Sequence, residues 1–94
     1  MTRARAFTTL ELTSRFDKSF ARLSAKLQEQ CEATLHALLQ EPLRPGLRLK
    51  PVLPGKKYWE VRINRADRLI IFPQGNVAYI MDIVTHDEIG KWGS

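Results

Sequence analysis

The spacing of hydrophobic and polar residues changes twice along the chain, and each spacing predicts a different kind of element. Residues 7–12 alternate and contain threonines, which is the composition of a strand. From Phe16 to Cys31, apolar residues recur every three or four positions, as on one face of a helix. After Pro42 the alternation returns and continues to Val84, so the second half of the chain is expected to form a sheet.

The helical part is expected to contain two helices. Ser14 and Asp17 have capping-box spacing, with aspartate in place of the usual glutamate, so a helix should begin there. One unbroken helix from Ser14 to Pro42 would be long for a small domain. We therefore expect a break near Ser24, with Ser24 capping a second helix that stops at Pro42. The result is an antiparallel helical hairpin or one kinked helix.

Three or four further strands are predicted after the helices, each a run of apolar and β-branched residues between turn signals. They span residues 47–53, 58–64, 68–72 and 77–84. Pro51 favours an edge position for the first of them. The last is apolar enough to lie in the centre of the sheet. Residues 65–67 and 73–76 are the expected turns, and a short helical turn is expected near the C-terminus.

These elements predict an α+β fold in two layers. An N-terminal strand is followed by a helical hairpin and then by an antiparallel sheet of three to four strands. The apolar face of the helices covers one face of the sheet, and the other face is left for polar residues or a partner. A chain of 94 residues is the size of one domain, which we place at residues 1–94.

The composition is that of a folded soluble protein, with 44% hydrophobic and 27% charged residues. No apolar run is long enough to span a membrane, and no apolar segment of the secretory type follows the first arginines. The single cysteine, Cys31, excludes an internal disulfide and a multi-cysteine metal site. A reducing, bacterial cytoplasm is therefore the expected location.

The chain carries a net charge of +5, which favours a polyanionic partner such as nucleic acid, an acidic protein or a membrane surface. Most of the excess lies between residues 44 and 68, where only Glu60 and Asp67 are acidic. The basic residues of this segment are Arg44, Arg48, Lys50, Lys56, Lys57, Arg62, Arg65 and Arg68. The positive charge is thus expected on the sheet.

Arg62 and Arg68 are expected to lie near each other on adjacent strands, because only a short polar link separates the strands. Two guanidinium groups held close together repel each other, so the pair needs an explanation. One alternative is a solvated sheet face on which Glu60 and Asp67 neutralise the arginines. The other is a site for a phosphate, because a guanidinium donates paired hydrogen bonds to phosphate oxygens.

The sequence contains no metal-binding motif, glycine-rich phosphate loop or nucleophile elbow. What remains is His86 after the last strand, together with the basic sheet. Cleavage of RNA by attack of the 2′-hydroxyl needs a base, an acid and cations around the phosphate, but no metal. Histidine serves as acid or base near neutral pH. Alternatively, His86 is a surface residue, and Asp87 and Glu88 simply open a short helix.

The order and spacing of several short motifs resemble the RelE/ParE superfamily of toxins from type II toxin–antitoxin modules. These motifs are residues 16–20 with Leu23, residues 49–55, residues 58–63, residues 67–72 and residues 82–89. The resemblance covers nearly the whole chain and implies a RelE-like, microbial-RNase-like fold. For RelE-like members it implies metal-independent cleavage of messenger RNA in the ribosomal A site, restrained by an antitoxin that wraps the toxin.

The resemblance also implies roles for individual residues. Arg68 matches the arginine that contacts the scissile phosphate, and Arg62 matches its support on the preceding strand. His86 is best placed for acid–base chemistry. The residues expected to bind RNA through their charge are Arg48, Lys50, Lys56 and Lys57.

Two positions depart from the family pattern. Gly90 stands where many relatives carry a tyrosine or another aromatic residue, and Leu47 stands where some carry a glutamate. An aromatic side chain for stacking or acid–base chemistry is therefore missing at position 90, unless Tyr79 or Trp92 replaces it.

The sequence thus predicts a ribosome-dependent messenger RNA endonuclease toxin that uses no metal and no small-molecule cofactor. Its expected partners are messenger RNA on the ribosome and an acidic cognate antitoxin, and no membrane. The alternative is a ParE-like inhibitor of DNA gyrase that acts by binding protein, which the missing aromatic residue favours. A third alternative is a degenerate toxin retained only for an antitoxin or a regulatory complex on DNA.

Overall fold

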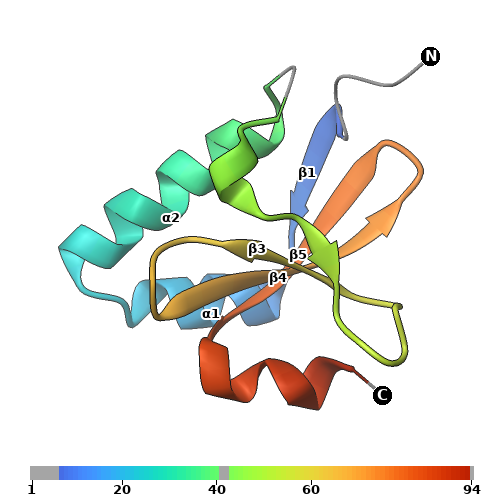
Figure 1. Cartoon of the computed structure of the whole chain (residues 1–94). Coiled ribbons are helices and arrows are strands. Elements are labelled where there is room, and N and C mark those ends of the chain that lie inside the picture. Colours follow the sequence, from blue (N-terminus) through green and yellow to red (C-terminus); the bar gives the residue numbers. More distant parts are fainter. Residues whose placement is uncertain (1–6, 41–42, 94) are drawn as a thin grey trace.

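The computed structural model describes residues 7–40 and 43–93, which form one five-stranded sheet, two α-helices and two 3₁₀ segments. In chain order the elements are β1 (Thr9–Leu12), α1 (Ser14–Ala21), α2 (Ala25–Leu38), η1 (Pro45–Leu47), β2 (Lys50–Pro51), β3 (Trp59–Arg62), β4 (Asp67–Gln74), β5 (Val77–Thr85) and η2 (His86–Trp92). Figure 1 shows the two helices beside the sheet and η2 folded back below the end of β5. The predicted α+β order is confirmed.

The strand order in the sheet is β1-β5-β4-β3-β2. Strands β2 to β5 form the predicted antiparallel meander. Strand β1 pairs with β5 in parallel, so the sheet is mixed and β5 lies inside it, as its apolar composition predicts. Parallel neighbours need a long connection, and here both helices and three strands supply it.

The break between the helices is confirmed. The Oγ of Ser24 accepts a hydrogen bond from the N–H of Leu27 at 3.2 Å, which is the predicted cap of α2. Helix α2 ends at Leu38, and Pro42 lies outside the described residues. Neither helix within residues 7–40 and 43–93 has the length and apolar character needed to cross a membrane.

The first helix is capped one residue earlier than predicted. The cap is Thr13, whose Oγ1 accepts a hydrogen bond from the N–H of Phe16 at 3.2 Å. The same hydroxyl donates to the carbonyl of Ile80 at 2.7 Å. This bond to β5 holds Thr13 in the extended conformation that a cap requires, so Ser14 becomes the first helical residue instead.

The main hydrophobic core lies between the helices and the sheet. Its buried side chains are Phe7, Phe16, Cys31, Ala37, Leu38, Leu47, Val61, Leu69, Ile71, Ala78 and Ile80. Phe16 and Cys31 come from the predicted apolar face of the helices, and Phe20 packs against the cluster from the same face. Burial of this apolar surface is the main force that holds the two layers together.

The opposite face of the sheet, which we call the outer face, is only partly open, and this corrects the prediction. Segment η2 folds onto it and forms a second buried cluster of Val52, Ile70, Val84 and Ile89. Ile70 and Ile71 are neighbours in β4, so the alternation of a strand places Ile71 in the main core and Ile70 in this second cluster. The register with β5 shifts between them: Ile70 pairs with Asp82 and Ile71 with Ile80, which leaves Met81 as an extra residue in β5. The part of the outer face near the β3–β4 turn stays available for polar residues.

Two predicted strand boundaries are wrong. The strand expected over residues 47–53 shrinks to Lys50–Pro51, because η1 ends in Arg48 with a left-handed φ of 52°. Strand β2 is an edge strand, as Pro51 predicts. Strand β4 continues through Pro73, so the turn before β5 is shorter than expected and uses Gly75 at a φ of 61°.

Candidate functional site

Arg62 and Arg68 lie directly opposite each other on β3 and β4, as the sequence predicts. Opposed residues of antiparallel strands have Cα atoms roughly 5 Å apart and point to the same face, so the two side chains start side by side on one face of the sheet. Arg68 lies in turn opposite Val84 of β5, two residues before His86. The register therefore brings the three predicted catalytic residues to the same end of the sheet.

Arg68 is held in place by the protein. Its Nη1 donates to the carbonyl oxygens of Asn64 at 2.8 Å, Asp67 at 3.1 Å and Arg65 at 3.2 Å. Its Nε lies 3.7 Å from Oε1 of Glu60, and the two side chains are only 12% and 11% exposed. Among the described residues, Nη2 makes no hydrogen bond.

The pairing of Arg68 with Glu60 matches the alternative in which carboxylates neutralise the arginines. Glu60 also lies opposite Lys50 across β2 and β3. Arg62 is half-buried, and none of the ion pairs among the described residues includes it. The two arginines therefore differ: Arg68 is tied to the fold, whereas Arg62 has no ion-pair partner among the described residues.

Asn64 shapes the turn at this end of the sheet, and the sequence analysis missed it. Its Oδ1 accepts hydrogen bonds from the N–H groups of Ala66 and Asp67, both at 2.8 Å. Its Nδ2 donates to Oε1 of Gln30 at 2.8 Å, which ties the turn to α2. Asparagine is common in turns, so its role in this turn could have been predicted from the sequence. Its hydrogen bond to Gln30 on α2 can be seen only in the folded structure.

His86 is the first residue of η2, and its side chain is 66% exposed. Its backbone N–H donates to the carbonyl of Ala66 at 2.8 Å, which fastens the end of β5 to the β3–β4 turn. Its Nδ1 lies 3.9 Å from Oδ1 of Asp87. Within residues 7–40 and 43–93, no group of three or more acidic, histidine or cysteine side chains is placed to hold a metal ion.

Segment η2 begins as the sequence predicts, with Asp87 and Glu88 in its first turn. Oε1 of Glu88 accepts a hydrogen bond from the N–H of Thr85 at 2.9 Å. Hydrogen bonds from the backbone and then the side chain of Thr85 lower the pKa of Glu88. This ionised cap fixes the point where β5 stops, and therefore the position of His86.

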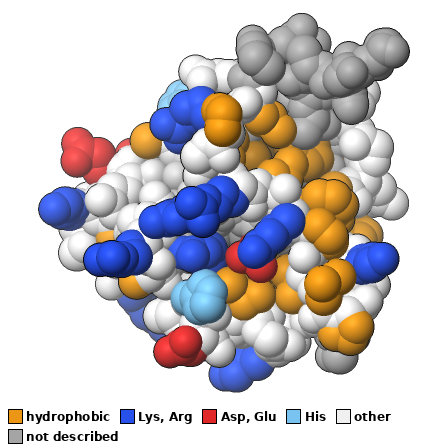
Figure 2. All heavy atoms as spheres, viewed as in Figure 1, with side chains coloured by type: hydrophobic (Ala, Val, Ile, Leu, Met, Phe, Trp, Pro, Cys, Tyr) orange, Lys and Arg blue, Asp and Glu red, His pale blue; other side chains and the backbone are white. Residues whose placement is uncertain are grey.

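The four residues expected to bind RNA are all exposed and follow the β2 side of the sheet. Arg48 follows η1, Lys50 lies in β2, and Lys56 and Lys57 lie in the connection to β3. Arg48 and Lys56 both have left-handed backbone conformations, with φ of 52° and 63°. Figure 2 shows Lys and Arg side chains gathered over the centre and left of this view, with a histidine at the lower border of the group.

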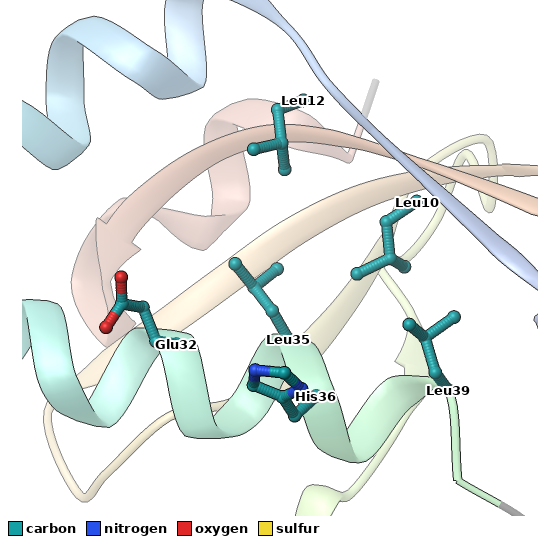
Figure 3. A pocket seen from close by; sticks show the side chains of 6 residues that line it. All are labelled: Leu10, Leu12, Glu32, Leu35, His36 and Leu39. Atoms are coloured by element: carbon teal, nitrogen blue, oxygen red, sulfur yellow. The ribbon is translucent and has the colours of Figure 1, made fainter.

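An apolar groove of about 550 Å³ runs between β1 and α2, apart from the arginine pair. The residues that line it are Leu10, Leu12, Glu32, Leu35, His36 and Leu39. Figure 3 shows leucines of both elements pointing into the same space. Leu12 and Leu39 are 50% and 38% exposed, so the groove presents apolar side chains to solvent.

The fold is that of the RelE/ParE type of toxin. No protein-family model and no curated protein sequence matches the chain. The toxin of the RelB–RelE antitoxin–toxin complex from Methanococcus jannaschii superimposes with a TM-score of 0.68 at 12% identity, over 87% of this chain and 96% of that one. At such identities the likeness establishes the fold, and it confirms the predicted RelE-like architecture.

Two further solved structures agree. YafQ from Escherichia coli has a TM-score of 0.67 at 17% identity, over 83% of this chain and 92% of its own. A YoeB/ParE toxin from Agrobacterium tumefaciens has a TM-score of 0.66 at 16% identity, over 83% of this chain and 98% of its own.

Proposed function

We propose that residues 1–94 act as one toxin domain of a type II toxin–antitoxin module, and that it cleaves messenger RNA on the ribosome. The observation that carries this proposal is the pairing of Arg62 with Arg68 at the end of the sheet where η2 begins with His86. Paired cations beside an exposed imidazole suit attack of a ribose 2′-hydroxyl on the adjacent phosphorus, without a metal. The similarity to RelE, YafQ and YoeB/ParE toxins supports it.

The two arginines neutralise the phosphate in different ways. Arg68 is preorganised by the turn carbonyls and by Glu60, so its Nη2 meets a phosphate oxygen without first being ordered. Arg62 supplies the second guanidinium from the opposite strand. Donors that are fixed before the reaction stabilise the charge that develops in the transition state at little reorganisation cost.

His86 moves a proton during the reaction. The 2′-oxygen–phosphorus bond forms as the phosphorus–5′-oxygen bond breaks, which gives a 2′,3′-cyclic phosphate and a 5′-hydroxyl. One proton leaves the 2′-hydroxyl and one reaches the 5′-oxygen. The other histidine, His36, lines the groove on α2, so the described residues offer one imidazole for two proton transfers. When ribosomal RNA orients the 2′-hydroxyl for attack, the protein needs to supply less acid–base catalysis. This is a reason to place the reaction on the ribosome.

An acidic antitoxin is the proposed protein partner. Acidic residues would neutralise the basic outer face, and an apolar helix or strand would fill the groove that contains Leu12 and Leu39. Strand β1 pairs only with β5 among the described residues, so its other edge is open to a partner backbone. Together these surfaces let one wrapped partner cover both the cations and the exposed leucines.

Inhibition of DNA gyrase by a ParE-like mode is the second candidate. It is favoured by Gly90, which leaves η2 without an aromatic side chain near His86. Trp92 and Tyr79 do not replace it, because Trp92 packs against Tyr58 at 4.9 Å between ring centroids and Tyr79 packs against Phe72 at 6.2 Å. A gyrase inhibitor would need the surface of the toxin but not the Arg62–His86 arrangement.

Induced expression in bacteria separates the two functions. For the nuclease we expect Arg62→Ala and His86→Ala to relieve growth arrest and to remove the cuts that primer extension detects in translated messages. A gyrase inhibitor would instead induce the DNA damage response and change plasmid supercoiling. Lys26→Ala, at an exposed lysine of α2, is the matched control and should stay toxic. If Arg62→Ala and His86→Ala both remain fully toxic, the site assignment is wrong.

A further inference from the structure

A hollow of about 370 Å³ lies at the C-terminal end of η2, away from the arginine pair. The residues that line it are Arg15, Lys57, Tyr58, Lys91 and Trp92. They come from α1, from the connection between β2 and β3, and from η2. Three of the five side chains are cationic and the other two are aromatic, which is a combination with a specific chemical preference.

The two aromatic rings of the hollow pack against each other. The rings of Tyr58 and Trp92 meet edge to face, with centroids 4.9 Å apart and an interplanar angle of 85°. Tyr58 continues into Phe72, at 6.0 Å between centroids. Tyr58 and Trp92 also pack against the buried cluster of the outer face, yet each stays half-exposed. Both rings are therefore partly open to solvent in the hollow.

The cations are placed above these rings. Nζ of Lys57 lies 5.3 Å from the ring centroid of Tyr58, and Cζ of Arg15 lies 5.1 Å from that of Trp92. Arg15 is balanced by Asp82, with 2.9 Å between Nε and Oδ2. Among the described residues, no ion pair includes Lys57 or Lys91, although Lys91 does attract Glu88. The hollow thus retains positive charge beside its aromatic rings.

We propose that this hollow binds one nucleotide of single-stranded RNA, with the base against Tyr58 and Trp92 and the neighbouring phosphates near Lys57 and Lys91. Bases stack on aromatic rings with little dependence on sequence, and cations beside the rings attract the backbone. An acidic peptide would match the lysines but would leave the rings without a stacking partner. The inference rests on the proposed function, because it assumes that the substrate is RNA.

The hollow lies at a distance from the place where the RNA bond would be cut. Segment η2 runs from His86 to Trp92, and a 3₁₀ rise of about 2 Å per residue over six steps separates its ends by roughly 12 Å. A nucleotide held there adds affinity for the RNA but does not touch the reacting phosphate.

Fluorescence of Trp92 tests this site directly. Trp59→Phe leaves Trp92 as the only tryptophan, so quenching reports on the hollow alone. We expect a single-stranded RNA hexanucleotide to quench the emission, and an abasic ribose-phosphate hexamer of equal charge to bind at least tenfold more weakly. Lys57→Ala and Lys91→Ala in this background should each weaken RNA binding several-fold and lower its salt dependence by about one phosphate contact. Lys26→Ala, the control, should change neither.

Equal binding of the abasic hexamer, quenching by hexaglutamate as strong as by RNA, or no quenching at all would overturn the inference. The first two results would indicate a site for polyanions or for an acidic protein. The proposed function is scored separately, by cleavage of messenger RNA in a translation extract. A chain that cuts RNA without quenching of Trp92 contradicts the inference alone, and a chain that shows base-dependent quenching without cutting contradicts the proposed function alone.

Discussion

Arg62 and Arg68 lie opposite each other on neighbouring strands, yet they make different contacts with the rest of the protein. Arg68 satisfies three carbonyl groups of the β3–β4 turn and pairs with the nearly buried Glu60. Arg62 makes no ion pair with a described residue. Loss of activity on substitution therefore has a different meaning at the two positions, and only Arg62 reports cleanly on the chemistry.

This difference predicts unequal effects on stability. Arg68→Ala leaves Glu60 with an uncompensated buried charge and should lower the free energy of unfolding by about 3 kcal/mol. Arg62→Ala should change it by less than about 1 kcal/mol. Urea denaturation followed by circular dichroism measures both. Equal losses for the two variants would contradict the structural role assigned to Arg68.

Cys31 is expected to be unreactive in the native state. Burial, and to a smaller extent Glu32, raises the pKa of its thiol from 9.0 to about 12. Because the thiolate is the nucleophile, a disulfide reagent at mildly alkaline pH should modify the unfolded chain and spare the folded one. Rapid modification of the native protein would show that the core around α2 opens easily.

The same shift sets the direction of a pH effect. The folded pKa is higher than the unfolded one, so the unfolded chain loses its proton first as the pH rises. Stability should therefore be unaffected below pH 9 and should fall between pH 9 and about 12. Cys31→Ala should remove this component of the alkaline loss, which urea midpoints at several pH values measure.

At the scale of elements, the helix caps give a matched pair of substitutions. Ser24→Ala removes the side-chain oxygen that accepts from Leu27 and should cost about 1 kcal/mol. Ser14→Ala changes an exposed serine that the sequence marks as a cap but that the structure places inside α1, so it should cost little. Thermal or urea unfolding of the two variants shows which of the two serines caps a helix.

The elements that the sequence predicted well depend on local chemistry. The helix break at Ser24, the edge position of β2 and the pairing of Arg62 with Arg68 follow from capping, proline and short-turn rules. The errors concern contacts between distant segments. Thr13 is a cap because Ile80 anchors it, and the outer face is half-covered because Ile89 returns to pack on Ile70.

The candidate site was predicted to a similar depth. Residue types and their spacing along the chain indicated the cations and His86. Local patterns do not give the distances between these side chains in the fold, or the carbonyl groups that hold Arg68. Lys57 illustrates the limit: the sequence places it with the general RNA-binding residues, whereas the structure places its Nζ over Tyr58 and Phe72. That position depends on three segments meeting in the fold.

At the scale of the whole molecule, the groove and the basic face lie on different surfaces and allow a prediction about the antitoxin. Leu12→Glu or Leu39→Glu places a charge in the groove and should weaken the proposed complex with an antitoxin at least tenfold, while the proposed cleavage of messenger RNA persists. Calorimetry with the purified antitoxin measures the affinity, and Lys26→Ala is the control. Unchanged affinity in both leucine variants would remove the groove from the proposed interface.

The central claim is that this molecule cuts RNA through an arginine pair and one imidazole. The most direct test is to add the purified chain to ribosomes programmed with a defined message and to determine the chemistry of the new RNA ends. We expect 2′,3′-cyclic phosphate and 5′-hydroxyl ends, formed in the presence of a chelator and lost with Arg62→Ala or His86→Ala but not with Lys26→Ala. An intact message after incubation with the folded wild-type chain would contradict the account.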